Sequence, residues 1–259
     1  MCRISTLLTL ASLFLYQWAL GLNPSTTYLQ YPDEIGLDHE AILVRTDDGA
    51  MLNAWYFPGQ QNHNGEMVLF SHDGDGNMAN YLTRVAALIE QGYAVVSFDY
   101  RGYGQSSGFD IDPTIYVYPE FETDLQTMIH HCELVYKQPL HLYGWGVGAG
   151  LALGVGFNHP AVHKIIADTP YLSFEDLKKR LKDDPIKNQS DFKSQPIYSV
   201  AGTPGSNLER VLLIVGEEDP IFSVKDMKNI RSKQKDLVEP VYVVKRATGK
   251  DNYRVGGNN

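Results

Sequence analysis

From about residue 38 onward, strand-like and helix-like segments alternate along the chain, and this order restricts the fold more than any other feature. The predicted strands cover 40–46, 52–57, 66–71, 94–100, 139–144, 162–168, 210–216 and 239–246. The predicted helices cover 80–93, 119–136, 147–157, 173–183 and 223–234. The first two strands flank a short turn and are predicted to form a hairpin. Alternating strands and helices build a mostly parallel sheet with helices on both faces, and ligands bind beyond the C-terminal strand ends.

One strand-to-helix junction, LHLYGWGVGAG at 140–150, carries glycine at Gly144, Gly146, Gly148 and Gly150. Residues 144–149 (GWGVGA) match the dinucleotide-binding pattern G-x-G-x-x-G/A. Asp168 ends the next strand, 24 residues after Gly144, near where an acid would meet a ribose hydroxyl. That pattern normally opens its domain, whereas here it follows the fifth predicted strand. The stretch also fits the nucleophile elbow G-x-S-x-G, with Gly144 and Gly148 as flanks and Gly146 in place of the serine.

Three other segments favour the elbow. Residues 95–108 (VVSFDYRGYGQSSG), 68–81 (VLFSHDGDGNMANY) and 212–223 (LLIVGEEDPIFS) resemble three segments of α/β-hydrolase-fold proteins. Those segments are a strand with its following loop, the oxyanion loop and the part that carries the triad acid. Because they occur in the family's order, the chain resembles the serine-peptidase (S33/S9-like) and esterase-like group of that fold. The resemblance implies an α/β-hydrolase domain over 22–259, with an antiparallel N-terminal hairpin, helices on both sheet faces and a short lid-like segment at 170–207.

The family's mechanism uses a serine nucleophile, a histidine base, a carboxylate that orients the histidine, and two backbone N–H groups that stabilise the oxyanion. By resemblance, Asp219 occupies the position of the triad acid. Gly146 occupies the position of the nucleophile, but glycine has no side chain that could attack a substrate. None of the eight histidines follows Asp219, and Lys250 or Asp251 stands where the family has its histidine. A protonated lysine is a poor base, so we expect Lys250 to form a salt bridge with Asp219. The triad positions Gly146, Asp219 and Lys250 are thus a remnant with no intact catalytic set.

The same resemblance places His72, Asp73 and Val147 at the oxyanion hole. Asp73 and Asp75 would bring negative charge to the place where an oxyanion forms, which opposes acyl-transfer chemistry.

The run DGDGN at 73–77 also resembles the start of a calcium loop. Met78 and Arg84 stand where the EF-hand pattern requires glycine and glutamate. A polar turn is therefore favoured, and we expect neither a metal nor a cofactor.

Together, these features predict an α/β-hydrolase-like protein that is inactive as a serine hydrolase. It would bind an unknown small molecule or protein in the remnant cleft, for which Phe174 and Leu177 are candidate lining residues. Two alternatives remain open. One is an active ester or peptide hydrolase that uses Ser71, Ser106 or Ser107, with His72 as its base. The other is a dinucleotide-binding protein.

The composition narrows the partners and the location. The net charge is −9 and there is no basic block, which argues against nucleic acid. Residues 1–21 contain one cation followed by an apolar stretch, and they end in small residues, as in a signal peptide or membrane anchor. We expect the protein to be exported (periplasmic, secreted or lumenal) or anchored, with possible membrane association through residues 1–21. Cys132, the one cysteine after that segment, is expected to be a small buried helix residue.

Overall fold

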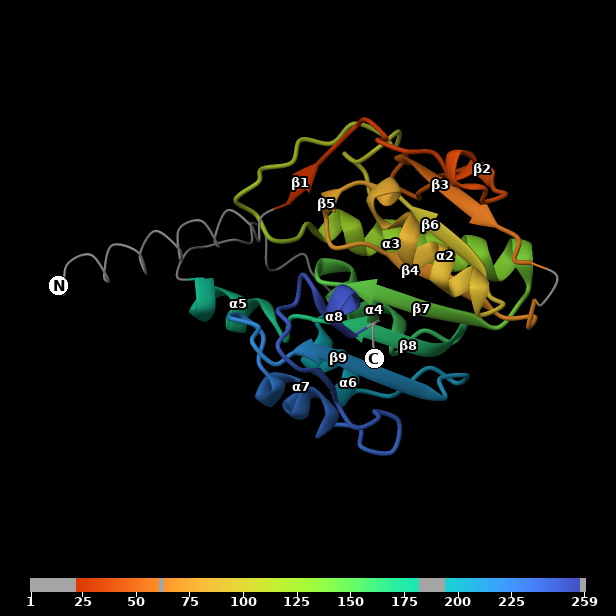
Figure 1. Ribbon diagram of the computed structural model, residues 1–259. Coiled ribbons are helices and arrows are strands. Elements are labelled where there is room, and N and C mark those ends of the chain that lie inside the picture. The colour runs from red at the N-terminus through yellow and green to blue at the C-terminus, as the bar shows by residue number, and fades with distance from the viewer. Residues whose placement is uncertain (1–21, 61–62, 182–193, 257–259) are drawn as a thin grey trace.

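The computed structural model describes residues 22–60, 63–181 and 194–256. Its main element is an eight-stranded sheet in the order β10-β9-β8-β7-β4-β6-β3-β2 (Figure 1). The strands are β2 (Glu40–Arg45), β3 (Met51–Phe57), β4 (Met67–Ser71), β6 (Ala94–Phe98), β7 (Leu140–Trp145), β8 (Val162–Asp168), β9 (Arg210–Gly216) and β10 (Tyr242–Val244). β2–β3 and β3–β6 are antiparallel, and all other neighbours are parallel. The predicted mostly parallel sheet with an N-terminal hairpin is confirmed.

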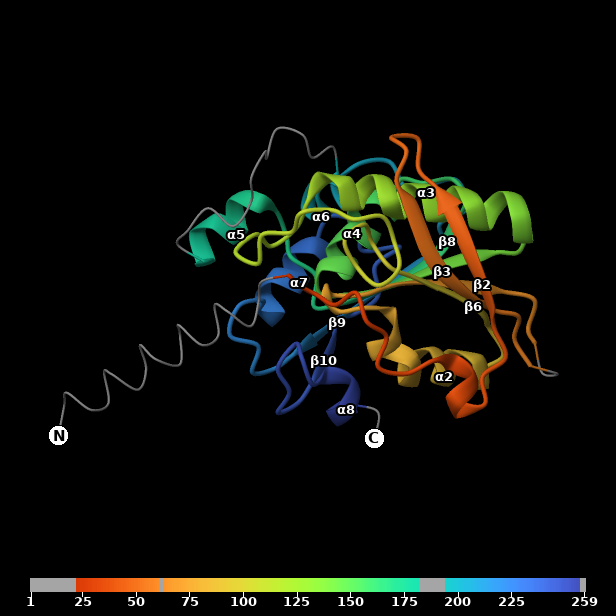
Figure 2. The ribbon, with the colours of Figure 1, turned by 90° about the horizontal axis from the view of Figure 1, so that it is seen from above.

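Helices cover both faces of this sheet (Figure 2). The helices are α2 (Leu82–Glu90), α3 (Pro119–Tyr136), α4 (Val147–Gly156), α5 (Phe174–Leu181), α6 (Pro196–Ala201), α7 (Val224–Arg231) and α8 (Asn252–Gly256). In Figure 2, α3, α4 and α6 lie on one side of the sheet, whereas α2 and α8 lie on the other. Alternate residues of β4 accordingly enter separate cores, Leu69 on the α3–α4 side and Phe70 on the α2 side.

Several short elements were not predicted. β1 (Asn23–Pro24) pairs in parallel with β5 (Asp75–Gly76), and the 3-10 helices are η1 (Pro32–Ile35) and η2 (Met78–Tyr81). Helix α6 lies in a stretch interpreted as a polar segment. A ladder of two residues has no periodicity to detect, so sequence patterns alone do not find it.

Two predictions about buried residues have opposite outcomes. Cys132 is buried in α3, as expected. Phe174 and Leu177 were expected to line an open cleft, which is wrong, because both side chains are buried in the main core. Their spacing puts them on the apolar face of α5, and that face packs inward.

The expected signal peptide or anchor at 1–21 lies outside the described residues. Within the described ranges, no helix is both long enough and apolar enough to cross a membrane.

Candidate functional site

The junction between β7 and α4 is a sharp backbone turn. Gly146, which precedes α4, has φ 55° and ψ −115°, a conformation that side-chain-bearing residues rarely adopt. Its N–H donates to the carbonyl of Asp168 (2.9 Å), and its carbonyl accepts from the N–H of Gly150 (3.2 Å). Val147 begins the helix directly after this turn and is buried. The residue at the nucleophile position therefore stands on the strained strand-to-helix bend that an elbow requires.

The two flanking glycines are required by close backbone packing. A Cβ on Gly144 would overlap the carbonyl of Gly148, one turn ahead. A Cβ on Gly148 would overlap the carbonyls of Ser71 and His72, at the end of the neighbouring strand β4. Both contacts are with backbone, which cannot rotate away as a side chain can. Their role as elbow flanks accounts for these glycines without any phosphate ligand.

The side chain of Asp73 lies over Gly146. A Cβ placed on Gly146 would be 2.8 Å from the Cβ of Asp73, which is too close for two carbon atoms. The Asp73 carboxylate accepts hydrogen bonds from the hydroxyl of Tyr81 and from the N–H of Asp75 (3.1 Å). Burial raises the pKa of Asp73 to about 6. Asp73 thus occupies room that a nucleophile's side chain would need.

The acid position is engaged by backbone groups. One oxygen of Asp219 accepts from the N–H groups of Ile221 (2.9 Å) and Phe222 (2.6 Å), and the other from that of Gly249 (2.7 Å). The carbonyl of Gly249 in turn accepts from the indole N–H of Trp145 (2.9 Å). The loop after β10 is therefore brought to both the acid and the elbow, where the family places its histidine.

The expected Lys250–Asp219 salt bridge is wrong. Lys250 Nζ instead lies 3.9 Å from Asp75 Oδ2, across the site. The oxygens of Asp219 already accept three backbone N–H groups, whereas the Asp75 side chain is 54% exposed. Asp251, the other residue considered at the histidine position, accepts from the N–H of Thr248 (2.6 Å) and caps the turn before α8.

A buried cation beside the elbow was not identified from the sequence. The Arg84 guanidinium lies 3.9 Å from the centre of the Trp145 ring and 4.8 Å from that of Tyr253. Its Nη1 donates to the hydroxyl of Tyr143 (2.8 Å) and lies 3.5 Å from Asp168 Oδ2. The sequence feature that could have indicated this buried cation is an arginine among the apolar residues of α2.

Asp168, the acid of the dinucleotide interpretation, is not free to meet a ribose. Besides Arg84, it accepts from Asn252 Nδ2 (2.7 Å) and from the Thr169 hydroxyl (3.0 Å). Burial raises the pKa of Asp168, and Asn252 and Arg84 oppose that shift. The residue ties β8 to α2 and α8.

The serines of the alternative hydrolase interpretation are engaged in structural hydrogen bonds. Ser71 is buried, and its hydroxyl shares a 2.5 Å hydrogen bond with that of Tyr100. The Ser106 hydroxyl donates to the carbonyl of Asp99 (2.7 Å), and the Ser107 hydroxyl accepts from the N–H of Met51 (2.8 Å). None of the three is bonded to a histidine, so the structure brings no nucleophile–base pair together from these candidates.

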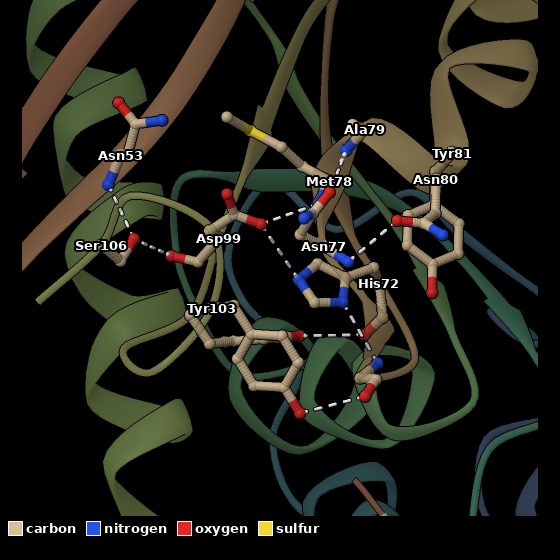
Figure 3. Close-up of polar contacts among 12 residues, drawn as sticks. Asn53, His72, Asn77, Met78, Ala79, Asn80, Tyr81, Asp99, Tyr103 and Ser106 are labelled. Carbon is tan, nitrogen blue, oxygen red and sulfur yellow. Dashed lines mark hydrogen bonds and ion pairs between the residues drawn. The ribbon is translucent and has the colours of Figure 1, made fainter. Parts of the chain in front are cut away.

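His72 is a buried loop residue, and Figure 3 shows its polar contacts. Its Nδ1 accepts from the N–H of Gly74 (3.1 Å), and its Nε2 lies 3.8 Å from Asp99 Oδ1. Burial lowers the pKa of His72 to about 3. The imidazole is therefore neutral and fully enclosed, which suits a structural role in the loop after β4.

Asp99, Arg101 and Tyr103 support the loops beneath the site. Arg101 forms ion pairs with Asp48 (2.6 Å) and Asp124 (2.7 Å), and the Tyr103 hydroxyl donates to the carbonyl of Gly74 (3.0 Å). Across the described ranges, no group of three or more His, Cys, Asp or Glu residues is placed to hold a metal ion.

The Asp99 carboxyl gives a testable pH dependence. It accepts from the Tyr28 hydroxyl (2.5 Å) and the N–H of Met78 (2.7 Å), and burial raises its pKa to about 7. The folded state therefore keeps this proton from about pH 4 to about pH 7 while the unfolded state loses it, so its contribution to stability falls as pH rises through that window. Asp99→Asn removes this pH-dependent loss of stability, because asparagine does not titrate. We expect the free energy of unfolding of the variant, relative to the wild type, to rise by about 3 kcal/mol between about pH 5 and pH 8. Urea unfolding at several pH values measures it, and a constant difference would contradict it.

Comparison with known proteins identifies a family for the chain. Residues 62–236 match the family described as serine aminopeptidase S33. The chain is 24% identical over 238 residues to the uncharacterized protein YfhR of Escherichia coli K12, covering 86% of this chain and 81% of that one. It is 26% identical over 159 residues to a yeast protein called uncharacterized membrane protein YNL320W, covering 57% and 52%.

Solved structures show the same fold. The Pyrococcus furiosus esterase Pf2001 aligns with a TM-score of 0.70 at 18% identity, over 92% of this chain and 94% of that one. XC6422 from Xanthomonas campestris, an α/β serine hydrolase without lid, aligns with a TM-score of 0.56 at 16% identity, over 85% and 94%. The dinucleotide-binding interpretation gains no support from these proteins. Since the family match covers more than half of the chain, the chain belongs to the serine aminopeptidase S33 family and has the α/β-hydrolase fold.

Proposed function

We propose that this protein is a non-catalytic member of its family, which keeps the hydrolase fold to bind a small molecule or a protein partner at the remnant site. The observation that carries the proposal is residue 146. It stands on the elbow with φ 55°, but as glycine it offers no atom that can attack an acyl carbon.

Two features of the surrounding site support the proposal. The Asp73 side chain lies over Gly146, and its carboxyl carbon is 4.0 Å from a Cβ placed on Gly146, so an acidic group stands beside any oxyanion formed at the elbow. The loop that contacts Asp219 presents Gly249 and Lys250 instead of a base. Nucleophile, base and oxyanion stabilisation are thus all altered, while the backbone of the elbow is kept.

We expect the purified protein to show no labelling by a fluorophosphonate probe and no turnover of a panel of p-nitrophenyl esters above the buffer rate. The probe reports an activated serine, whichever residue it is, and ester turnover reports any nucleophile or general base that cleaves an activated ester. Labelling of the unaltered chain would refute the proposal and favour an unconventional hydrolase, and mapping the labelled peptide would identify its serine.

A restored elbow provides the positive control. Gly146→Ser alone places its Cβ against Asp73, so Asp73→Gly is added to make room, together with Lys250→His to supply a base. Fluorophosphonate labelling of this triple variant, checked for folding by circular dichroism, would show that the missing atoms account for the inactivity. The single Gly146→Ser variant serves as its matched comparison.

A further inference from the structure

The first described residues lie against the oxyanion loop. We call residues 22–28 the N-terminal strap, and residues 72–77 the oxyanion loop. The strap's β1 pairs in parallel with β5 of the loop (Figure 1). The N–H of Asn23 donates to the carbonyl of Gly74 and the N–H of Ser25 to that of Gly76, both at 2.9 Å. The loop that lies over the elbow is therefore held by a strand from the start of the fold.

Side chains strengthen this pairing from both partners. Asn77 Nδ2 donates to the carbonyls of Ser25 (3.1 Å) and Thr27 (2.8 Å). From the strap, Asn23 Nδ2 donates to Asp75 Oδ1 (2.9 Å). Leu22 is buried and packs against Gly74. A Cβ placed on Gly74 would lie 2.6 Å from Leu22 Cδ2.

The loop residues held by the strap are those that position Asp73. The N–H of Asp75 donates to Asp73 Oδ1 (3.1 Å). The Tyr81 hydroxyl bridges the Asp73 carboxylate and the carbonyl of Asp75, the latter at 2.5 Å. Since Asp75 is fixed on one side by Asn23 and reached on the other by Lys250 (3.9 Å), the position of Asp73 over Gly146 depends on the strap.

We propose that the N-terminal strap is an autoinhibitory element that keeps the oxyanion loop closed, with Asp73 over Gly146, and that its release opens the elbow to small molecules. The proposal does not depend on whether the chain has hydrolytic activity.

The strap is built to be displaced more easily than the sheet. The part that meets the loop has a ladder of two residues, and residues 23–27 are exposed or half-buried. Tyr28 is the fixed end of the strap, because it is buried and its hydroxyl donates to Asp99 (2.5 Å), and the Ser25 carbonyl also accepts from the N–H of Gly104 (2.8 Å). Segments with few buried contacts and solvent-exposed backbone hydrogen bonds open at lower free energy than the core.

Asn77→Asp tests the strap with little change in shape. The new carboxylate keeps an oxygen to accept the N–H of Ala79, which Asn77 Oδ1 accepts at 3.1 Å, so the start of η2 stays capped. It replaces the two donors by an acceptor that faces two carbonyls. We expect amide hydrogen exchange at Asn23 and Ser25 to accelerate about tenfold or more, as for the loss of two hydrogen bonds, with exchange in β7 unchanged.

Asn158→Asp is the control for the loss of two side-chain donors, at an exposed position whereas Asn77 is buried. Asn158 Nδ2 also donates to two carbonyls, those of Ser199 (3.2 Å) and Thr203, away from the strap. If this variant accelerates exchange in the strap equally, the effect is general loosening and the proposal is wrong. If Asn77→Asp also exposes β7, Asn23→Ala replaces it, because this exposed side chain makes one bond to Asp75.

A cysteine at the elbow measures opening directly. Val147→Cys is placed in a Cys2→Ser background, where Cys132 stays buried. Val147 follows Gly146 and is 2% exposed; since cysteine is smaller than valine, the change adds no contact with Asp73, and iodoacetamide reports access to the thiol. We expect Asn77→Asp to raise the alkylation rate about tenfold, with no change from Asn158→Asp. Faster strap exchange without faster alkylation would show that the strap does not control the elbow, and an unchanged strap exchange would show that Asn77 does not hold it. Either result overturns the proposal.

Discussion

Replacing Arg84 by methionine is expected to lower the free energy of unfolding by about 3–5 kcal/mol, the usual cost of removing one partner from a buried ion pair. Arg84 is 6% exposed and Asp168 2% exposed. Water therefore cannot solvate the Asp168 carboxylate in place of the lost guanidinium. Methionine preserves most of the side chain's volume against Trp145, which limits the loss of packing. Urea unfolding followed by circular dichroism measures the change.

The double variant separates charge from packing. Asp168→Asn leaves an amide next to Asn252 and Thr169 and removes the unpaired charge. Arg84→Met with Asp168→Asn should therefore be more stable than Arg84→Met alone by about 1–3 kcal/mol. If Arg84→Met by itself costs less than about 1 kcal/mol, the pair behaves as an exposed one and the buried assignment is wrong.

Replacing Gly148 by alanine is expected to cost about 3 kcal/mol or more, at the upper end of overpacking effects. The added methyl group would overlap the carbonyls of Ser71 and His72, so α4 or β4 must move. The thermal unfolding temperature of the purified variant measures the loss.

Gly108→Ala is the matched control, because a Cβ at Gly108 meets nothing within 4 Å. We expect it to change stability by less than about 1 kcal/mol, with either sign. Equal effects of the two alanines would show that the elbow tolerates a side chain at its flank, and the elbow assignment would lose its packing basis.

The strands and the elbow were predictable because their signals are local. Apolar runs such as 66–71 and 210–216 are those of strands buried on both faces, and both are strands of the sheet, β4 (Met67–Ser71) and β9 (Arg210–Gly216). Gly144 and Gly148 are needed because backbone segments approach each other at a strand-to-helix turn, and that need appears directly in the sequence as glycine.

The polar partners were not predictable in this way. Lys250 was expected at Asp219 because the two are near in sequence and in the family's order, yet it reaches Asp75, 175 positions away. Phe174 and Leu177 were assigned to a cleft from their place in the lid-like segment, whereas the packing of α5 buries them. Neither the direction of a long side chain nor the face that a short helix buries is set by its own segment.

The sequence by itself determined the sheet, the order of its elements, the elbow and the absence of a reactive atom at residue 146, because each depends on periodicity or on one residue's chemistry. Only the tertiary structure decided that Asp73 lies over Gly146, that Arg84 pairs with Asp168 and that residues 22–28 pair with the loop after β4. These are contacts between segments far apart in the chain, and their geometry exists only once the sheet has brought the ends of its strands together.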